Sequence, residues 1–190
     1  MLSLQNKGCH NINFVSPSHF VPQIVEAVIL AAKDGLTLPL VYNTGGYDEI
    51  DTLKLLEGII DIYMPDIKFG DNIKAKKYTK SAKYFDIVKS AVKEMHRQVG
   101  DLKTNEEGIA CKGLLVRHLV MPENIADTDK ILEFIANEVS KDTLINIMSQ
   151  YYPAHKSYTF PELSRRISRN EYSEAVKYAE NLGLTNVMVT

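Results

Sequence analysis

The stretch DIYMPDIKFGD, residues 61–71, joins a short apolar run to polar residues at the point where the run ends. Four further apolar runs lie along the chain: INFV (12–15), PLVYN (39–43), GLLVRHLVM (113–121) and LINIM (144–148). Short apolar runs bounded by polar residues indicate buried strands, and those of a parallel sheet are covered on both faces. We therefore expect five strands in a sheet of this kind.

The segments between the runs have the spacing and the end signals of helices. Residues 21–35 begin with Pro22 near the start, where proline suits a first helical turn. A shorter helix is expected after Asp48. Residues 81–99 place apolar side chains at steps of three and four, and Ser81 is available to cap that helix.

Two more helices follow in the second half of the chain. Residues 127–139 carry an apolar stripe, and the last helix opens with Ser168 and Glu171 in capping-box spacing and stops at Gly183. Alternating strands and helices predict an α/β fold with a parallel sheet and right-handed crossovers. With no internal repeat or flexible linker, residues 1–190 are expected to form a single domain.

Composition narrows the classes of partner. The chain has 190 residues, 45% of them hydrophobic, and a formal net charge of −2. Such a balance gives no broad basic face for a phosphate backbone, so we do not expect nucleic acid as the partner. No apolar run is long enough to span a bilayer and the first residues lack the pattern of a signal peptide, so we expect a cytoplasmic protein without membrane contact.

Only two cysteines occur, Cys9 and Cys111. They are too few for a disulfide framework or a four-thiolate metal site, and we interpret both as reduced structural residues. Cys9, His10 and His19 have the donor types of a zinc site but supply too few ligands, so no metal site is predicted.

Polar or ionisable side chains end each of the five apolar runs. They are Ser16, Ser18 and His19; Asn43 and Thr44; Asp66 and Lys68; Arg117 and His118; and Ser149, Gln150 and Tyr151. In parallel α/β folds, ligands bind at the carboxyl ends of the strands. Five polar ends in register therefore predict one shared ligand site.

Three charged residues of this set carry the most specific expectation. Asp66 and Lys68 lie two apart on a strand and share a face, where they are suited to bind a ribose hydroxyl or a ligand carboxylate; the alternative is an ion pair with each other. Arg117 is expected to point inward as a fork for a carboxylate. His118 then points to the opposite face, either as a catalytic group or wedged among helices with its ring nitrogens satisfied.

The segments LQNKGCHNINFVSPSHFVPQIVEAV, VYNTGGYD, DIYMPDIKFGD, EMHRQVGDL, GLLVRHLVMPEN and INIMSQYYP resemble the radical S-adenosylmethionine superfamily. The likeness is to iron-sulfur proteins related to pyruvate formate-lyase activating enzyme. It implies a partial parallel (β/α) barrel, of which about five of six strand-helix units are present in this chain.

The resemblance also implies cofactors. In the family a C-x3-C-x2-C loop binds a [4Fe-4S] cluster, and S-adenosylmethionine bound to it yields a 5'-deoxyadenosyl radical for hydrogen abstraction. Activating enzymes generate a glycyl radical in a partner protein. The S-adenosylmethionine contacts implied for this chain are Ser16, His19, Asn43, Thr44, Asp66, Lys68, Arg117, Gln150 and Tyr151.

This sequence departs from the family pattern at two places, and both departures argue against activity of this chain. The segment FVSPSH lies where many relatives have a Gly-Gly-Glu motif, and no C-x3-C-x2-C loop is present. We expect the first strand and its cysteine loop to precede Met1, and the chain to be inactive by itself. The alternatives are a non-catalytic nucleoside-binding or scaffold module on the same fold, and an ordinary enzyme that uses His118 or His19 as a base.

Partners follow from the same expectation. They are a protein substrate or the segment that carries the cysteines. Residues 12–15 would form an unpaired sheet edge, through which we expect self-association.

Overall fold

The computed structural model describes all 190 residues of the chain. The chain forms two compact units: Met1–Pro65 with Ser90–Leu115, and Asp66–Lys89 with Val116–Thr190. Three elements contribute residues to both units: β3 (Ile62–Ile67), α5 (Tyr84–Val99) and β5 (Ala110–Leu119).

The remaining strands are β1 (Ile12–Val15), β2 (Leu40–Thr44), β4 (Lys103–Thr104), β6 (Leu144–Met148) and β7 (Val187–Val189). Their order is β1-β2-β3-β5-β6-β7, and β4 pairs with β5 in antiparallel fashion. The pairs β1-β2, β2-β3 and β6-β7 are parallel. The predicted α/β class is confirmed, and the sheet is open, as a partial barrel requires. The two shortest strands, β4 and β7, were not predicted because so few residues show no periodicity.

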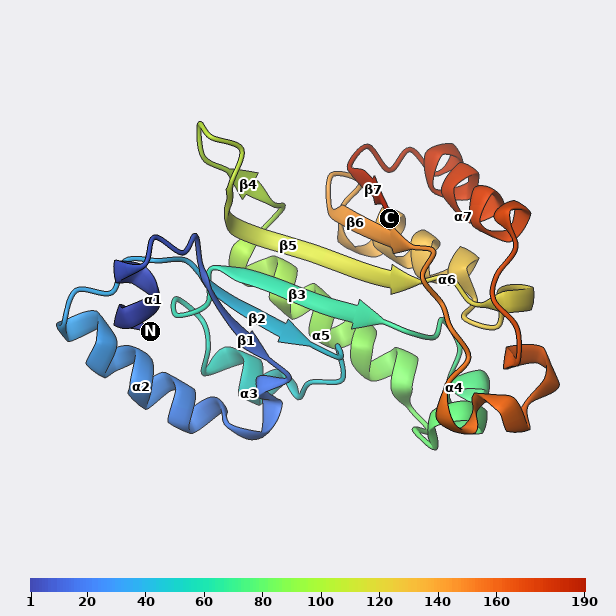
Figure 1. Ribbon diagram of the computed structural model, residues 1–190, viewed down its shortest axis with the longest axis horizontal. Coiled ribbons are helices and arrows are strands. Elements are labelled where there is room, and N and C mark those ends of the chain that lie inside the picture. The colour runs from blue at the N-terminus through green and yellow to red at the C-terminus, as the bar shows by residue number, and fades with distance from the viewer. The chain divides into compact units, whose positions relative to one another are not determined.

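The first unit contains α1 (Leu2–Asn6), the short 3-10 turn η1 (Pro17–His19), α2 (Val21–Lys33) and α3 (Ile50–Lys54). Figure 1 shows β1 and β2 side by side in this unit. Tyr42 lies opposite Tyr63 in the register, and both are fully buried. The next pair, Asn43 and Met64, is only half-buried. Side chains of a strand alternate between faces, so at the carboxyl ends of β2 and β3 one face is covered and the other is more open.

The second unit contains α4 (Asn72–Thr79), η2 (Pro122–Asn124), α6 (Thr128–Phe134), η3 (Ile135–Val139), η4 (His155–Thr159), η5 (Pro161–Leu163) and α7 (Arg169–Asn181). Figure 1 shows β6 and β7 side by side, and α6 packs against α7. Burial again alternates along the strands. Ile67 and His118 are fully buried, whereas Asp66 and Arg117 are partly exposed.

The predicted helices are confirmed, with corrections at two places. α5 begins at Tyr84, so Ser81 is not its cap; instead Asn72 Oδ1 accepts the backbone N–H of Phe85 at 2.8 Å. α4 was not predicted. Its N-cap is Asp71, whose side chain accepts two backbone N–H groups.

None of these helices combines the length and the apolar character needed to cross a lipid bilayer.

Candidate functional site

A charged cluster joins the end of β3 to the end of β5 within the second unit. Arg117 Nε and Nη2 lie 2.8 and 2.7 Å from Asp66 Oδ1, and Lys68 Nζ lies 3.4 Å from Asp66 Oδ2. The side chains of Asp66 and Arg117 retain 23% and 27% exposure, and that of Lys68 retains 47%. The ion pair between Asp66 and Lys68, which was the alternative to ligand binding, is thus present, and Arg117 binds the same carboxylate. Two cations and one anion give the cluster a net positive charge.

The backbone that carries Lys68 is fixed on both sides. The Lys68 N–H donates to the Tyr84 hydroxyl at 2.9 Å. Two residues later, the Gly70 N–H donates to the Ala126 carbonyl at 2.7 Å. A Cβ at Gly70 would lie 2.6 Å from the Asp127 carbonyl oxygen, which no side chain tolerates. Glycine is therefore required here for close approach of the two segments.

His118 points away from this cluster and is completely buried. Its Nδ1 lies 2.8 Å from the Ile67 carbonyl, and its Nε2 lies 2.9 Å from Thr128 Oγ1. A carbonyl only accepts, so Nδ1 carries the proton and Nε2 accepts from the threonine hydroxyl. Burial lowers the pKa of His118 to about 4. The structure therefore holds His118 as a neutral, satisfied histidine of the core, and a base role has no exposed nitrogen to act through.

Gln150 and Tyr151 both follow β6 but differ in burial and in their hydrogen-bond partners. Gln150 is exposed, and its Nε2 lies 3.6 Å from Met148 Sδ. Tyr151 is buried, and its hydroxyl donates to the Leu163 carbonyl at 2.8 Å; burial raises its pKa. The structure gives neither residue a hydrogen bond to the Asp66 cluster.

The first unit contains the other four predicted contacts. Ser16 adopts a left-handed conformation with φ 52°, and its N–H donates to the Asn43 carbonyl at 2.8 Å. Ser16 and His19 are exposed, Asn43 is half-buried and Thr44 is buried. The ends of β1 and β2 are thus tied together through backbone, while the side chains of Ser16 and His19 remain in solvent.

Asp48 organises this region and was not singled out as a site residue from the sequence. It is 3% exposed, and its oxygens accept from Ser18 Oγ at 2.6 Å, Thr44 Oγ1 at 2.6 Å and Tyr42 Oη at 3.0 Å. Burial, with the Asp48 charge as a second cause, raises the pKa of Tyr42. Three hydroxyl donors satisfy a buried carboxylate without a cation. The only sequence signal was an acid shortly after a strand end.

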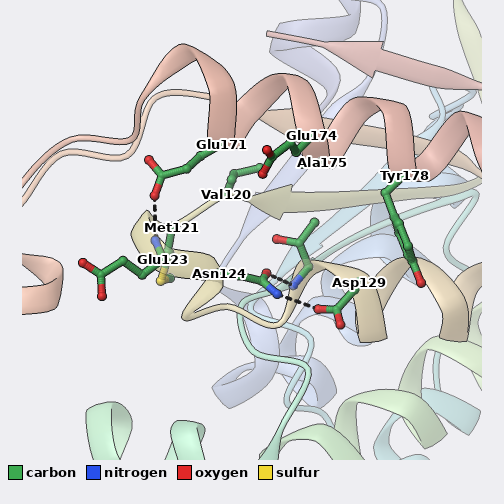
Figure 2. A pocket seen from close by; sticks show the side chains of 10 residues that line it. Val120, Met121, Glu123, Asn124, Asp129, Glu171, Glu174, Ala175 and Tyr178 are labelled. Atoms are coloured by element: carbon green, nitrogen blue, oxygen red, sulfur yellow. Dashed lines mark hydrogen bonds between the residues drawn. The ribbon is translucent and has the colours of Figure 1, made fainter.

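A surface pocket of about 300 Å³ lies elsewhere in the second unit. Its lining residues come from the β5–α6 connection, from α6 and from α7: Val120, Met121, Glu123, Asn124, Thr128, Asp129, Glu171, Glu174, Ala175 and Tyr178. Figure 2 shows Asn124 bonded to Asp129, and the Glu171 carboxylate bonded to the Glu123 backbone. None of these residues belongs to the set predicted from the sequence.

The thiols present do not fit the iron-sulfur cluster that the resemblance of the sequence implies. A C-x3-C-x2-C loop supplies three cysteines, whereas the chain contains Cys9 and Cys111. Cys111 Sγ donates to the Lys103 carbonyl at 3.3 Å. No group of three His, Cys, Asp or Glu side chains gathers closely enough to hold a metal ion.

Comparison with known proteins places the fold. No family profile matches the chain. An uncharacterised protein of Methanocaldococcus jannaschii is 32% identical over 177 residues, which is 92% of this chain and 47% of that protein. The chain therefore spans about half the length of the curated relative it matches.

Solved structures give the class of fold. A radical SAM methyltransferase from Sphaerobacter thermophilus superposes with a TM-score of 0.66 at 10% identity, covering 100% of this chain and 53% of its own. The chain therefore has the fold of radical S-adenosylmethionine enzymes.

A more particular match is a domain of pyruvate-formate lyase-activating enzyme from Bacteroides vulgatus. Its TM-score is 0.66 at 10% identity, and the match covers 96% of this chain and 99% of that domain. The activase-like fold predicted from the sequence is confirmed.

Proposed function

We propose that this chain binds S-adenosylmethionine, or a nucleoside that carries an amino-acid tail, at the Asp66 cluster. The observation that supports the proposal is the positive triad of Asp66, Arg117 and Lys68 at the ends of two strands. A partly buried site with excess positive charge favours a carboxylate, and strand ends are where parallel α/β folds bind ligands.

The three side chains have separable tasks in this proposal. Lys68 offers a flexible ammonium to the ligand carboxylate, since it is the most exposed of the three. Arg117 orients Asp66 through contacts to one oxygen, Oδ1. Asp66 Oδ2 is suited to accept a hydrogen bond from a ribose hydroxyl, because the only charged group of the cluster near it is the ammonium of Lys68.

Two solved structures with this fold are named as a radical SAM methyltransferase and as a domain of an activating enzyme. We propose that the ancestral activity of this chain was radical generation followed by hydrogen abstraction from a partner polypeptide. Bound S-adenosylmethionine would supply the nucleoside and the activated sulfonium. The two cysteines present do not fit the cluster, so no cleavage step is assigned to this chain. As it stands, the chain is proposed to act as a nucleoside-binding module.

Calorimetry tests the site directly. S-adenosylmethionine should bind more tightly than 5'-methylthioadenosine, which lacks the amino-acid tail. Lys68→Gln should weaken S-adenosylmethionine binding by about three- to tenfold, as expected for loss of a charge-assisted contact, and should abolish the preference. Lys54→Gln removes an exposed lysine that pairs with Asp51 on α3 and serves as the matched control.

Equal affinity for the two nucleosides, or an unchanged affinity of the Lys68→Gln variant for S-adenosylmethionine, would contradict the proposed site.

Anaerobic reconstitution with iron and sulfide distinguishes a nucleoside-binding module from an active radical enzyme. We expect no stable cluster. A chain that holds four irons and cleaves S-adenosylmethionine would overturn the assignment as a binding module while leaving the site intact.

A further inference from the structure

The helix α4 and the turn after it carry an unusual concentration of positive charge. Residues 72–85, NIKAKKYTKSAKYF, contain five lysines and no acid, in a chain whose net charge is −2. The five are Lys74, Lys76, Lys77, Lys80 and Lys83. Lys74 and Lys77 are paired, with Asp127 and Glu162 respectively. The other three are exposed and form no ion pair.

These charges are ordered along one side of the helix. Lys76, Lys77 and Lys80 lie three, four and seven positions after Ile73, so the four residues share one face of α4 and its C-cap. Ile73 is 79% exposed, the largest exposed fraction among the large apolar side chains. An exposed isoleucine therefore lies at one end of a row of lysines. We call Ile73, Lys76, Lys77 and Lys80 together the lysine face.

The lysine face is held in place by its other side. Asp71 Oδ1 accepts from the backbone N–H groups of Ile73 and Lys74 at 2.7 and 3.0 Å. The Tyr78 ring stacks on Phe69 with centroids 5.8 Å apart and meets Phe160 edge-on at 5.1 Å. A surface fixed in this way loses little conformational freedom when a partner binds.

We propose that the lysine face docks an acidic polypeptide segment that also carries an apolar side chain. Carboxylates would pair with Lys76 and Lys80, and the apolar side chain would cover Ile73. This surface shares no residue with the Asp66 cluster, so the proposal goes beyond nucleoside binding and does not depend on it.

The same features favour polypeptide over the other polyanions. A nucleic acid would place charged phosphates against Ile73. The aromatic residues of this segment, Tyr78, Tyr84 and Phe85, are half-buried or buried, which leaves no exposed ring for base stacking. An anionic bilayer would require a continuous apolar side opposite the lysines, whereas that side of α4 carries Ala75 and Tyr78 against the rest of the unit.

Fluorescence anisotropy with a labelled peptide of glutamates interspersed with leucines tests the surface. The double variant Lys76→Gln/Lys80→Gln should bind the peptide about tenfold more weakly, because each exposed ion pair contributes roughly a factor of two to five in affinity. Ile73→Ser should weaken it about threefold, and added salt should weaken it further. The control replaces Lys33 and Lys177, exposed lysines of α2 and α7, by Gln and keeps the same net charge.

One variant separates binding from folding. Lys80 ends α4 in a left-handed conformation with φ 67°, which favours glycine. Lys80→Gly should therefore keep or raise the thermal midpoint while it weakens peptide binding. The proposal is overturned if wild type fails to bind the peptide, if the control pair weakens binding equally, or if a single-stranded oligonucleotide or phosphatidylserine vesicles bind this face more tightly than the peptide.

Discussion

At the scale of single residues, His118 should make stability depend on pH. The unfolded histidine titrates at its ordinary value of 6.5 and the buried one at a pKa of about 4. Between these values the unfolded chain binds the extra proton, so stability is complete above pH 6.5 and is lost as the pH falls toward 4. The loss amounts to about 3 kcal/mol at most. Urea unfolding at a series of pH values measures it.

His118→Gln should flatten this profile between pH 6.5 and 4, even though it lowers stability at pH 7 by disturbing the bonds to Ile67 and Thr128. His10→Gln, which changes an exposed histidine, should retain the slope of wild type. An equal slope in both variants would mean that another group controls the acid sensitivity.

The sequence predicted some residue contacts because they depend only on local geometry. Asp66 and Lys68 share a face on any extended strand, and their pairing was an anticipated alternative. The bond between Arg117 and Asp66 joins residues 51 positions apart. It depends on which strands are neighbours and in what register, and neither is written in the two segments alone. The hydroxyl contacts of Asp48 were missed for the same reason.

At the scale of elements, the capping box of α7 gives a stability prediction. Ser168 Oγ accepts the Glu171 N–H, and a Glu171 oxygen accepts the Ser168 N–H at 2.7 Å. Ser168→Ala should destabilise the protein by about 1 kcal/mol, equivalent to roughly 2–4 °C in thermal midpoint for a chain of this size. Thermal unfolding followed by circular dichroism measures it.

Ser173→Ala lies in the same helix at an exposed interior position and serves as the control. Alanine is the better helix former there, so its midpoint should stay equal or rise. If Ser168→Ala behaved like Ser173→Ala, the capping box would contribute nothing measurable.

The capping box of α7 was predictable because it is a fixed spacing of two residue types, whereas α4 escaped prediction. Its lysines blur the apolar pattern, and only Ala75 is buried along its length. Asp71, which caps it, follows Gly70 and reads as part of a turn. Tertiary support from Phe69 and Phe160 stabilises α4, and that support is not visible in the sequence.

At the scale of the whole molecule, β1 is an end strand of the sheet order. Val15, at its carboxyl end, is 68% exposed. We expect concentration-dependent self-association through this edge, and Val15→Lys should reduce it because charged side chains protect sheet edges. Light scattering over a range of concentrations measures it, with Ile29→Lys on α2, a residue 49% exposed, as the control. A wild-type chain that stays monomeric at high concentration would refute the expectation.

The fold class was accessible from the sequence because the runs at 12–15, 39–43, 61–67, 113–121 and 144–148 each became a strand. The ligand site was accessible only in outline. Polar residues do end these strands, but some of them, such as Tyr151 and Thr44, are engaged in bonds of the core. Burial separates such residues from available ones, and the sequence does not report burial.

The close approach at Gly70 bears on how relatives of this chain can be recognised. Asp66, Lys68 and Gly70 are spaced by two residues each, and the last admits no side chain because of the Asp127 carbonyl. The pattern Asp-x-Lys-x-Gly therefore combines a charged pair with a glycine that the backbone of Asp127, in another part of the chain, requires. Such a pattern is more selective in a search of divergent sequences than the two charges alone, because chance rarely supplies both.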